Sequence, residues 1–162
     1  MIDTDVQQLD ASLVHALLRW PDRQSDVRAW QGHVPFARWL MAAMQPAQVV
    51  ELGVHKGDSL CAFCEAARWF GLGTTVHGIG LWEGDAHAGI YGDDVLAELR
   101  AYRDTHYPAT ARLHRMSFDD AAAEFADGTI DLLHIDGCHT YDAVARDFET
   151  WVPKLCPSGV VL

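Results

Sequence analysis

The fold is decided by the stretch VVELGVHKGDS, residues 49–59. Its beginning predicts a short apolar strand. Gly53 and Gly57 follow, and glycine lets the backbone turn sharply and approach a ligand where side chains would collide. Asp58 and Ser59 are residue types that cap the start of a helix. The stretch therefore predicts a strand, a tight turn and a helix whose beginning faces a ligand.

From Ala47 onward, short β-rich runs alternate with helical segments. The runs expected to be strands are 48–52, 74–79, 111–115, 130–135 and 159–162. The segments expected to be helices are 59–70, 93–105, 118–126 and 141–155. This alternation predicts an α/β fold, a Rossmann-like doubly wound parallel sheet of about five strands, whose ligands bind beyond the carboxyl ends of the strands.

Two apolar helical patterns precede the sheet. The first runs over Val6–Trp20 and stops at Pro21, and the second runs over Phe36–Met44. They predict an N-terminal helical cap over residues 1–45, followed by one α/β domain over residues 46–162.

The sequence ends inside an apolar run, Val160-Val161-Leu162. A strand without its next connection leaves an open sheet edge that invites association. We therefore expect a sheet that is truncated after its fifth strand, or an edge that something else covers, and we expect a homo-oligomer.

The 162 residues are 49% hydrophobic and 22% charged, which is typical of one globular domain with a real core. The formal charge of −11 would repel nucleic acid and an anionic membrane surface. No apolar run approaches the ~20 residues of a membrane span, and residues 1–10 are acidic where a signal peptide would be basic. We expect a cytoplasmic protein with a small neutral or cationic partner and without nucleic acid or membrane partners.

Four cysteines do not make a disulfide framework in a chain of this size. Cys61 and Cys64 fall in a helical pattern, which indicates small buried residues and not a redox pair. With Cys138 and His139 they match no regular zinc spacing. We expect neither a redox motif nor a zinc site.

The turn after the first strand differs from two common nucleotide motifs. A P-loop needs Gly, Lys and Ser or Thr in succession, whereas Lys56 precedes Gly57 here. A dinucleotide fingerprint needs a third glycine beside Gly53 and Gly57. Instead, the acidic Glu51 lies at the end of the strand, and an acid in this place suits a cationic ligand such as S-adenosylmethionine.

Three motifs together resemble the class I S-adenosylmethionine-dependent methyltransferases, in particular the bacterial small-molecule and sugar O-methyltransferase branch. They are ELGVHKGDS at 51–59, HGIGLWEGD at 77–85 and LLHIDGCHTY at 132–141. The resemblance covers residues 47–162. It implies S-adenosylmethionine as cofactor, S-adenosylhomocysteine as product and a small-molecule acceptor.

The resemblance also implies cofactor contacts from the loops after the first four strands. The residues concerned are Glu51, Gly53, His55, Gly57, Asp58, Ser59, Gly80, Leu81, Trp82, Ser117, Phe118 and Asp136. One of them departs from the family, whose second strand ends in an acid that holds the ribose hydroxyls, because Gly80 stands there. Glu83 or Asp85 could supply that carboxylate, or each is a solvated loop acid. The segment Trp82–Gly92 has the composition of a flexible lid.

Asp136 ends the fourth predicted strand, and His139 follows in the next loop. A histidine takes a hydroxyl proton near neutral pH, while a carboxylate orients it or holds Mg²⁺. His139 is therefore the predicted base and Asp136 its partner, unless Asp136 only caps a turn. Metal-dependent relatives use further acids after the fifth strand, beyond Leu162. We thus predict no metal ligand in this chain and Mg²⁺ only in a full-length form.

Three hypotheses remain open. The leading one is methyl transfer from S-adenosylmethionine to a hydroxyl of a sugar or other small metabolite. The second is a catalytically silent S-adenosylmethionine-binding or interaction module, which Gly80 and the abrupt end favour. The third, a nicotinamide-dependent oxidoreductase, is disfavoured by the incomplete glycine fingerprint and the missing ribose acid.

Overall fold

The computed structural model describes residues 11–85 and 89–162. Its main sheet has the strand order β5-β2-β1-β6-β7, with every neighbouring pair parallel. The strands are β1 Gln48–Leu52, β2 Thr75–Gly80, β5 Ala111–Arg115, β6 Ile130–Ile135 and β7 Leu155–Val161. The predicted Rossmann-like sheet of five parallel strands is confirmed.

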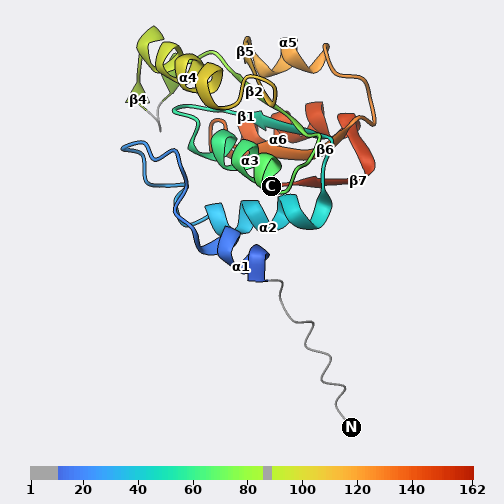
Figure 1. The fold of residues 1–162 in the computed structure, drawn as a ribbon. Helices are drawn as coiled ribbons and strands as arrows, with labels where there is room; N and C mark the ends of the chain where they lie inside the picture. The colour runs from blue at the N-terminus through green and yellow to red at the C-terminus, as the bar shows by residue number, and fades with distance from the viewer. Residues whose placement is uncertain (1–10, 86–88) are drawn as a thin grey trace.

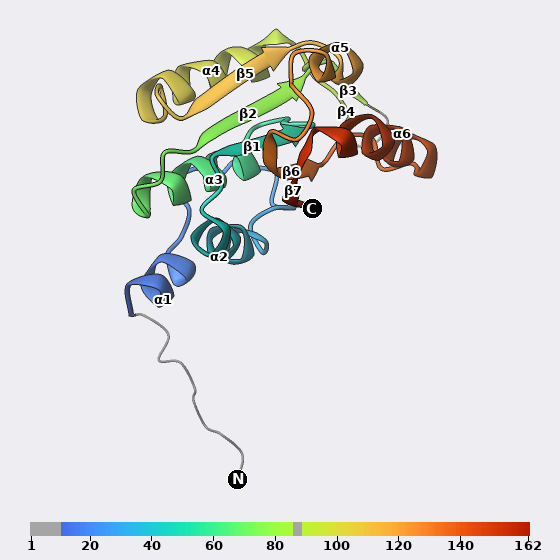
Figure 2. The same ribbon diagram turned by 90° about the vertical axis from the view of Figure 1, so that its right-hand side faces the viewer.

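Helices cover both faces of this sheet (Figures 1 and 2). One core cluster joins the sheet to α2 Val34–Met44, α3 Asp58–Trp69 and α4 Asp93–His106. The opposite cluster joins it to α5 Phe118–Ala122 and α6 Tyr141–Trp151. The short helix α1 Ala11–Leu18 lies outside α2 (Figure 2). No described helix combines the length and the apolar character that crossing a membrane requires.

A buried ion pair ties α1, α2 and α3 together. Arg38 donates to Glu65 with 2.7 Å between Nη2 and Oε2, and both side chains are fully buried. Arg38 Nη1 also donates to the carbonyl oxygens of Ala16 and Arg19, and the guanidinium lies 4.5 Å from the ring centroid of Trp69. These contacts fix the N-terminal helices against the sheet domain.

The strand order determines where a ligand-binding crevice can form. The chain runs from β1 outward to β2 and β5, then returns to β6 on the other side of β1. Such a reversal opens a crevice at the carboxyl ends of the strands. Hydrogen bonds hold the crevice floor together: Gly53 N–H donates to Ile79, and Asp136 N–H donates to Leu52.

Several boundaries differ from the prediction. The last helix ends at Trp151 and not at Leu155, because Pro153 lacks an N–H and a 3₁₀ turn, Val152–Lys154, replaces the helix. The strand β7 then begins at Leu155, four residues earlier than predicted, with Pro157 on an edge strand where proline is tolerated.

The predicted lid segment Trp82–Gly92 contains two short antiparallel strands, β3 Gly84–Asp85 and β4 Gly89–Ile90. Gly84 has a positive φ of 81°, and a Cβ there would lie 1.9 Å from the Gly89 carbonyl oxygen. Glycine is therefore required for this close pairing. Residues 86–88 and the predicted helical residues 6–10 lie outside the described part of the chain.

Candidate active site

An open cleft of about 910 Å³ lies at the carboxyl ends of the strands. Its size falls within the ~300–1,000 Å³ of typical ligand pockets. Nine of the residues predicted from the sequence to bind the cofactor or act in catalysis line it: Gly53, His55, Gly80, Leu81, Trp82, Ser117, Phe118, Asp136 and His139. The four other predicted cofactor contacts, Glu51, Gly57, Asp58 and Ser59, do not line it.

Gly53 forms the centre of the cleft floor. Its φ is 91°, and a Cβ built on it would lie 2.2 Å from the carbonyl oxygen of Asp136. No side chain fits this approach, since β1 and β6 continue into touching backbone. Glycine at position 53 is therefore required by the contact between these two turns, and the residue also lines the cleft.

Glu51 is fully buried beneath this floor. Its Oε1 accepts a hydrogen bond from Ser59 Oγ and lies 3.3 Å from Nδ1 of His134, its register partner on β6. Burial raises the pKa of Glu51, against the opposing effect of His134 and Ser59. Burial alone would lower the pKa of His134, but the Glu51 carboxylate outweighs it and raises that pKa. Glu51 and Ser59 thus join β1, β6 and α3 under the ligand.

The same buried pair, together with Asp136, offers three potential metal-ligand atoms within 4.8 Å of one another. Glu51 and His134 do not line the cleft, and Oε1 of Glu51 already accepts from Ser59. The donor set fits an internal ion pair better than an exchangeable metal site.

Gly57 and Asp58 position the start of α3. Gly57 has a φ of 80°, and a Cβ there would lie 2.5 Å from Leu99 of α4. Asp58 accepts from Ser25, with 2.8 Å from the backbone nitrogen and 2.6 Å from Oγ. Asp58 thus binds the N-terminal segment, a role that the helix-cap pattern did not reveal.

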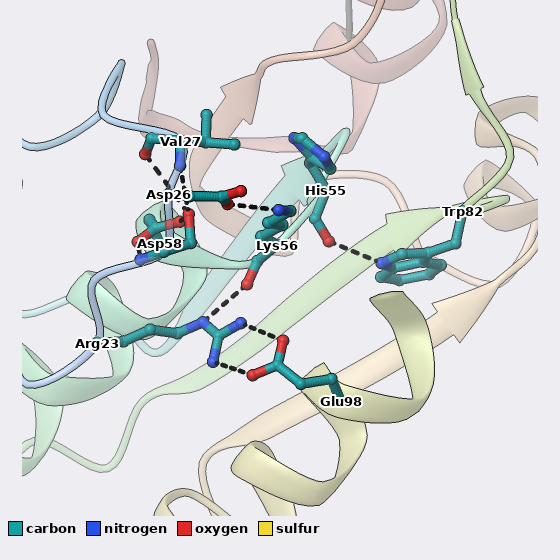
Figure 3. Close-up of polar contacts among 9 residues, drawn as sticks. Arg23, Asp26, Val27, His55, Lys56, Asp58, Trp82 and Glu98 are labelled. Carbon is teal, nitrogen blue, oxygen red and sulfur yellow. Dashed lines mark hydrogen bonds and ion pairs between the residues drawn. The ribbon is translucent and has the colours of Figure 1, made fainter. Parts of the chain in front are cut away.

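That segment, residues 22–30, is a strap that packs against the loop after β1 and the start of α3 (Figure 3). Arg23 donates from Nε to the Lys56 carbonyl oxygen at 2.7 Å and pairs with both oxygens of Glu98 on α4. Lys56 in turn contacts Asp26. The strap brings Val27 and Ala29 to the cleft wall.

Sequence reasoning missed Val27 and Ala29. They lie in an irregular stretch between two helices, and neither carries a chemical group that a motif could identify.

Trp82 closes one side of the cleft. Its side chain is 4% exposed, and Nε1 donates to the His55 carbonyl oxygen at 2.9 Å (Figure 3). The His55 ring stacks on Tyr91 with centroids 4.5 Å apart. These contacts join the loops after β1 and β2. Tyr91 was not nominated from the sequence.

Asp136 and His139 meet at the cleft, with 3.2 Å between Oδ1 and Nε2. The His139 side chain is 61% exposed and that of Asp136 is 30% exposed. The Asp136 carboxylate can orient the His139 imidazole, and the exposed imidazole is accessible to a ligand in the cleft. The predicted pair is adjacent in space, and its catalytic role stays a prediction.

At the β5 end of the cleft, Ser117 caps α5 by accepting from Asp120 N–H, while Phe118 faces the cleft. Across from them, α6 contributes cleft residues that the sequence did not nominate: Asp142, Ala143, Arg146 and Asp147. The sequence over α6 predicts an amphipathic helix. The helical period alone does not show which of its residues line the cleft at the carboxyl ends of the strands.

The comparisons agree with this geometry. Residues 50–162 match a family described as a methyltransferase domain. The y4gI protein of Sinorhizobium fredii is 40% identical over 153 residues, which cover 94% of this chain but 17% of that protein. The chain therefore spans about a sixth of the length of this curated relative.

Solved structures share the fold at low identity. The SAH-bound methyltransferase PaMTH1 of Podospora anserina has a TM-score of 0.63 at 16% identity, covering 94% of this chain and 61% of that one. The O-methyltransferase TomG of Streptomyces achromogenes, solved with SAM, has a TM-score of 0.62 at 15% identity, covering 95% and 65%. The sequence match over residues 50–162 shows that the chain belongs to this methyltransferase-domain family, and the two solved methyltransferases share its Rossmann-like fold.

Proposed function

We propose that this chain binds S-adenosylmethionine in the cleft and transfers its methyl group to a hydroxyl of a sugar or other small metabolite. The observation that carries the proposal is the Asp136–His139 pair, 3.2 Å apart, on a cleft whose floor is the bare Gly53 backbone. The family match and the neighbours solved with SAM or SAH support the choice of cofactor.

The residues present fit this cofactor. Gly53, which follows β1, and Gly80, which ends β2, line the cleft without side chains. The cleft lining carries the carboxylates Glu83, Asp119, Asp136, Asp142 and Asp147 against one arginine, Arg146. This balance favours a ligand with an ammonium and a sulfonium over an anion.

When bound, S-adenosylmethionine supplies an electrophilic methyl group on a sulfonium. Transfer breaks the sulfur–methyl bond and forms an oxygen–methyl bond, and the acceptor hydroxyl must lose its proton. A neutral His139 that donates from Nε2 to Asp136 accepts this proton at Nδ1. The Asp136 carboxylate then stabilises the imidazolium. The rest of the site holds the reactants in line and excludes water.

The test pairs two variants with two measurements. We expect His139→Gln to lower methyl transfer by about 10²–10⁴-fold, the usual value of a positioned base, while the Kd for S-adenosylhomocysteine measured by calorimetry stays within about twofold. Asp136→Asn should lower the rate as well, by removing the charge that orients His139. Turnover is followed with radiolabelled S-adenosylmethionine and a panel of hydroxylated glycosides and phenols.

Retained turnover in a folded His139→Gln chain would exclude this residue as the base. Binding of S-adenosylhomocysteine without transfer to any acceptor would favour the second candidate, a catalytically silent binding module. The observation behind that candidate is Gly80, which leaves the end of β2 without a ribose carboxylate.

A further inference from the structure

Two histidines outside the cleft lie against each other on the sheet. His77 is on β2, and His114 is on β5, the neighbouring edge strand (Figure 2). Nδ1 of His77 and Nε2 of His114 are 3.0 Å apart. The Phe125 ring meets the His77 ring edge-on at 5.1 Å between centroids, which packs this imidazole in place on the face that α5 covers. Neither histidine lines the cleft, and the proposed methyl transfer does not use them.

The two facing nitrogens are spaced like ligands of one metal ion. In a tetrahedral zinc site each Zn–N distance is about 2.0–2.1 Å, which places two imidazole nitrogens about 3.3 Å apart. The observed 3.0 Å is close to that spacing, and the His114 side chain is 21% exposed, so an ion can reach the pair from solvent. Imidazole nitrogens suit Zn²⁺, Cu²⁺ and Ni²⁺, whereas Mg²⁺ and Ca²⁺ take oxygen ligands. The pair thus has the spacing and the chemistry of a transition-metal site.

A carboxylate behind His114 favours the tautomer that a metal needs. Oε2 of Glu124 lies 3.7 Å from Nδ1 of His114. A negative charge beside Nδ1 favours the imidazole proton on that nitrogen, which leaves Nε2 with a free lone pair on the side of His77. With this tautomer, His77 donates its Nδ1 proton to His114 in the metal-free pair. When an ion binds, the proton of His77 moves to its Nε2, and both facing nitrogens become ligands.

The local charges affect the pair as a ligand in opposite ways. Burial first, and then the charges of His114 and Arg112, lower the pKa of His77 to about 4, so its imidazole stays neutral and able to bind a metal at neutral pH. Arg112, the register partner of His77, opposes binding because its positive charge repels a cation. Its Nη1 donates to the carbonyl oxygens of Pro108 and Ala111, which holds the guanidinium near the start of β5.

We propose that His77 and His114 bind one Zn²⁺ ion between β2 and β5, with Glu124 behind His114 and water in the remaining coordination positions. The inference is independent of the proposed function, because none of these three residues lines the cleft. The bound ion joins the edge strand β5 to the rest of the sheet. No spacing motif reveals the pair, since 37 residues separate the two histidines and the parallel pairing of β2 with β5 brings them together.

The test is calorimetry with ZnCl₂ on the metal-free chain, together with imidazole nitrogen NMR to identify the ligating atoms. We expect Zn²⁺ to shift the resonances of Nδ1 of His77 and Nε2 of His114. His77→Asn and His114→Asn each remove one of two ligands and should abolish this binding. Glu124→Gln should weaken it about tenfold, the low end for a partner behind a metal-binding histidine. Arg112→Gln should tighten it, because the repelling charge is gone.

His15→Asn is the matched control, since His15 is an exposed histidine on α1, which packs on α2 on the opposite face of the sheet. It should leave zinc binding unchanged. MgCl₂ should not compete with ZnCl₂, because Mg²⁺ prefers oxygen ligands. Circular dichroism of each variant checks that it is folded, and His114, on the edge strand and in contact with solvent, is the substitution less disruptive to packing.

Two results would overturn the proposal. A metal-free chain that binds no Zn²⁺ would leave His77 and His114 as a plain hydrogen-bonded pair. Equal zinc affinity in the unmodified chain and in both folded histidine variants would mean that the ion is held elsewhere. Either result leaves the proposed methyl transfer untouched, since that function is tested in the cleft.

Discussion

Single glycines differ in whether the backbone around the cleft has room for a side chain. Gly53 is the clearest case, because any side chain there would meet the Asp136 carbonyl carbon and oxygen and the Gly137 nitrogen within 3 Å. Gly80 differs: a Cβ at this position would lie 3.7 Å from Cε3 and Cζ3 of Trp82 and 4.0 Å from Val54 N, which is ordinary contact. A side chain is thus sterically admissible at Gly80, so packing does not require glycine at this position.

This difference makes Gly80→Asp a clean substitution. We expect the variant to bind S-adenosylhomocysteine about tenfold more tightly, because a carboxylate at the end of β2 can accept from the ribose hydroxyls. Desolvation of the new acid opposes part of the gain, so the expectation stays at the low end of the range for charged hydrogen bonds. Calorimetry on the purified variant measures it.

Gly80→Asn is the control with the same shape and no charge, and it should gain less. Equal or weaker affinity in a folded Gly80→Asp chain would show that the ribose is held elsewhere, and Glu83, a loop acid that lines the cleft, is then the residue to examine.

At the scale of elements, the strands and helices after residue 47 followed from the alternation of apolar runs and turn residues. The exceptions were local. Pro153 ended α6 early, and the change of helix into 3₁₀ turn moved the start of β7. Contacts between residues far apart in the sequence could not be predicted from local patterns. Nothing near Asp58 in the sequence indicates that it accepts a hydrogen bond from Ser25, and nothing on α6 indicates that Asp147 lies beside Gly137.

The strap is the element whose contribution can be measured separately. Asp58→Ala removes both acceptors of Ser25 and should cost about 1–3 kcal/mol of unfolding free energy. If the docked population of residues 22–30 falls to a tenth, the affinity for S-adenosylhomocysteine falls about tenfold, since Val27 and Ala29 leave the cleft wall. Hydrogen exchange of residues 22–30 reports the docking directly.

Asp93→Ala is the comparison variant, since it also removes an acid from the first turn of a helix but does not line the hollow beside the strap. It should preserve strap protection and affinity. Unchanged exchange rates in Asp58→Ala would mean that other contacts hold the strap without Ser25. These are the pairing of Arg23 with Glu98 and the edge-on contacts of the Trp30 ring with Phe63 and His134.

At the scale of the whole molecule, one partly buried histidine couples the stability of the fold to pH. Away from the cleft, His77 on β2 and His114 on β5 lie side by side, with 3.0 Å between Nδ1 and Nε2. His77 also meets Phe125 edge-on at 5.1 Å between centroids. Burial first, and then the charges of His114 and Arg112, lower the pKa of His77 to about 4. The folded chain therefore keeps His77 neutral at pH values where the unfolded chain protonates it.

The sign of the effect follows from this difference. Between the ordinary histidine pKa of 6.5 and the folded pKa of about 4, the unfolded state binds a proton that the folded state does not. Stability that is present above pH 6.5 should therefore decline as the pH falls through this window, with a slope of at most about 1.4 kcal/mol per pH unit for one proton. Urea unfolding at several pH values, comparing the unmodified chain with His77→Asn, isolates the contribution of His77.

Buried acids with raised pKa values, Glu51 and Glu65, act in the opposite direction but are common to both proteins and cancel in the comparison. The asparagine variant should show the shallower decline between pH 6.5 and 4, and identical slopes would mean that another group governs the acid sensitivity of this fold.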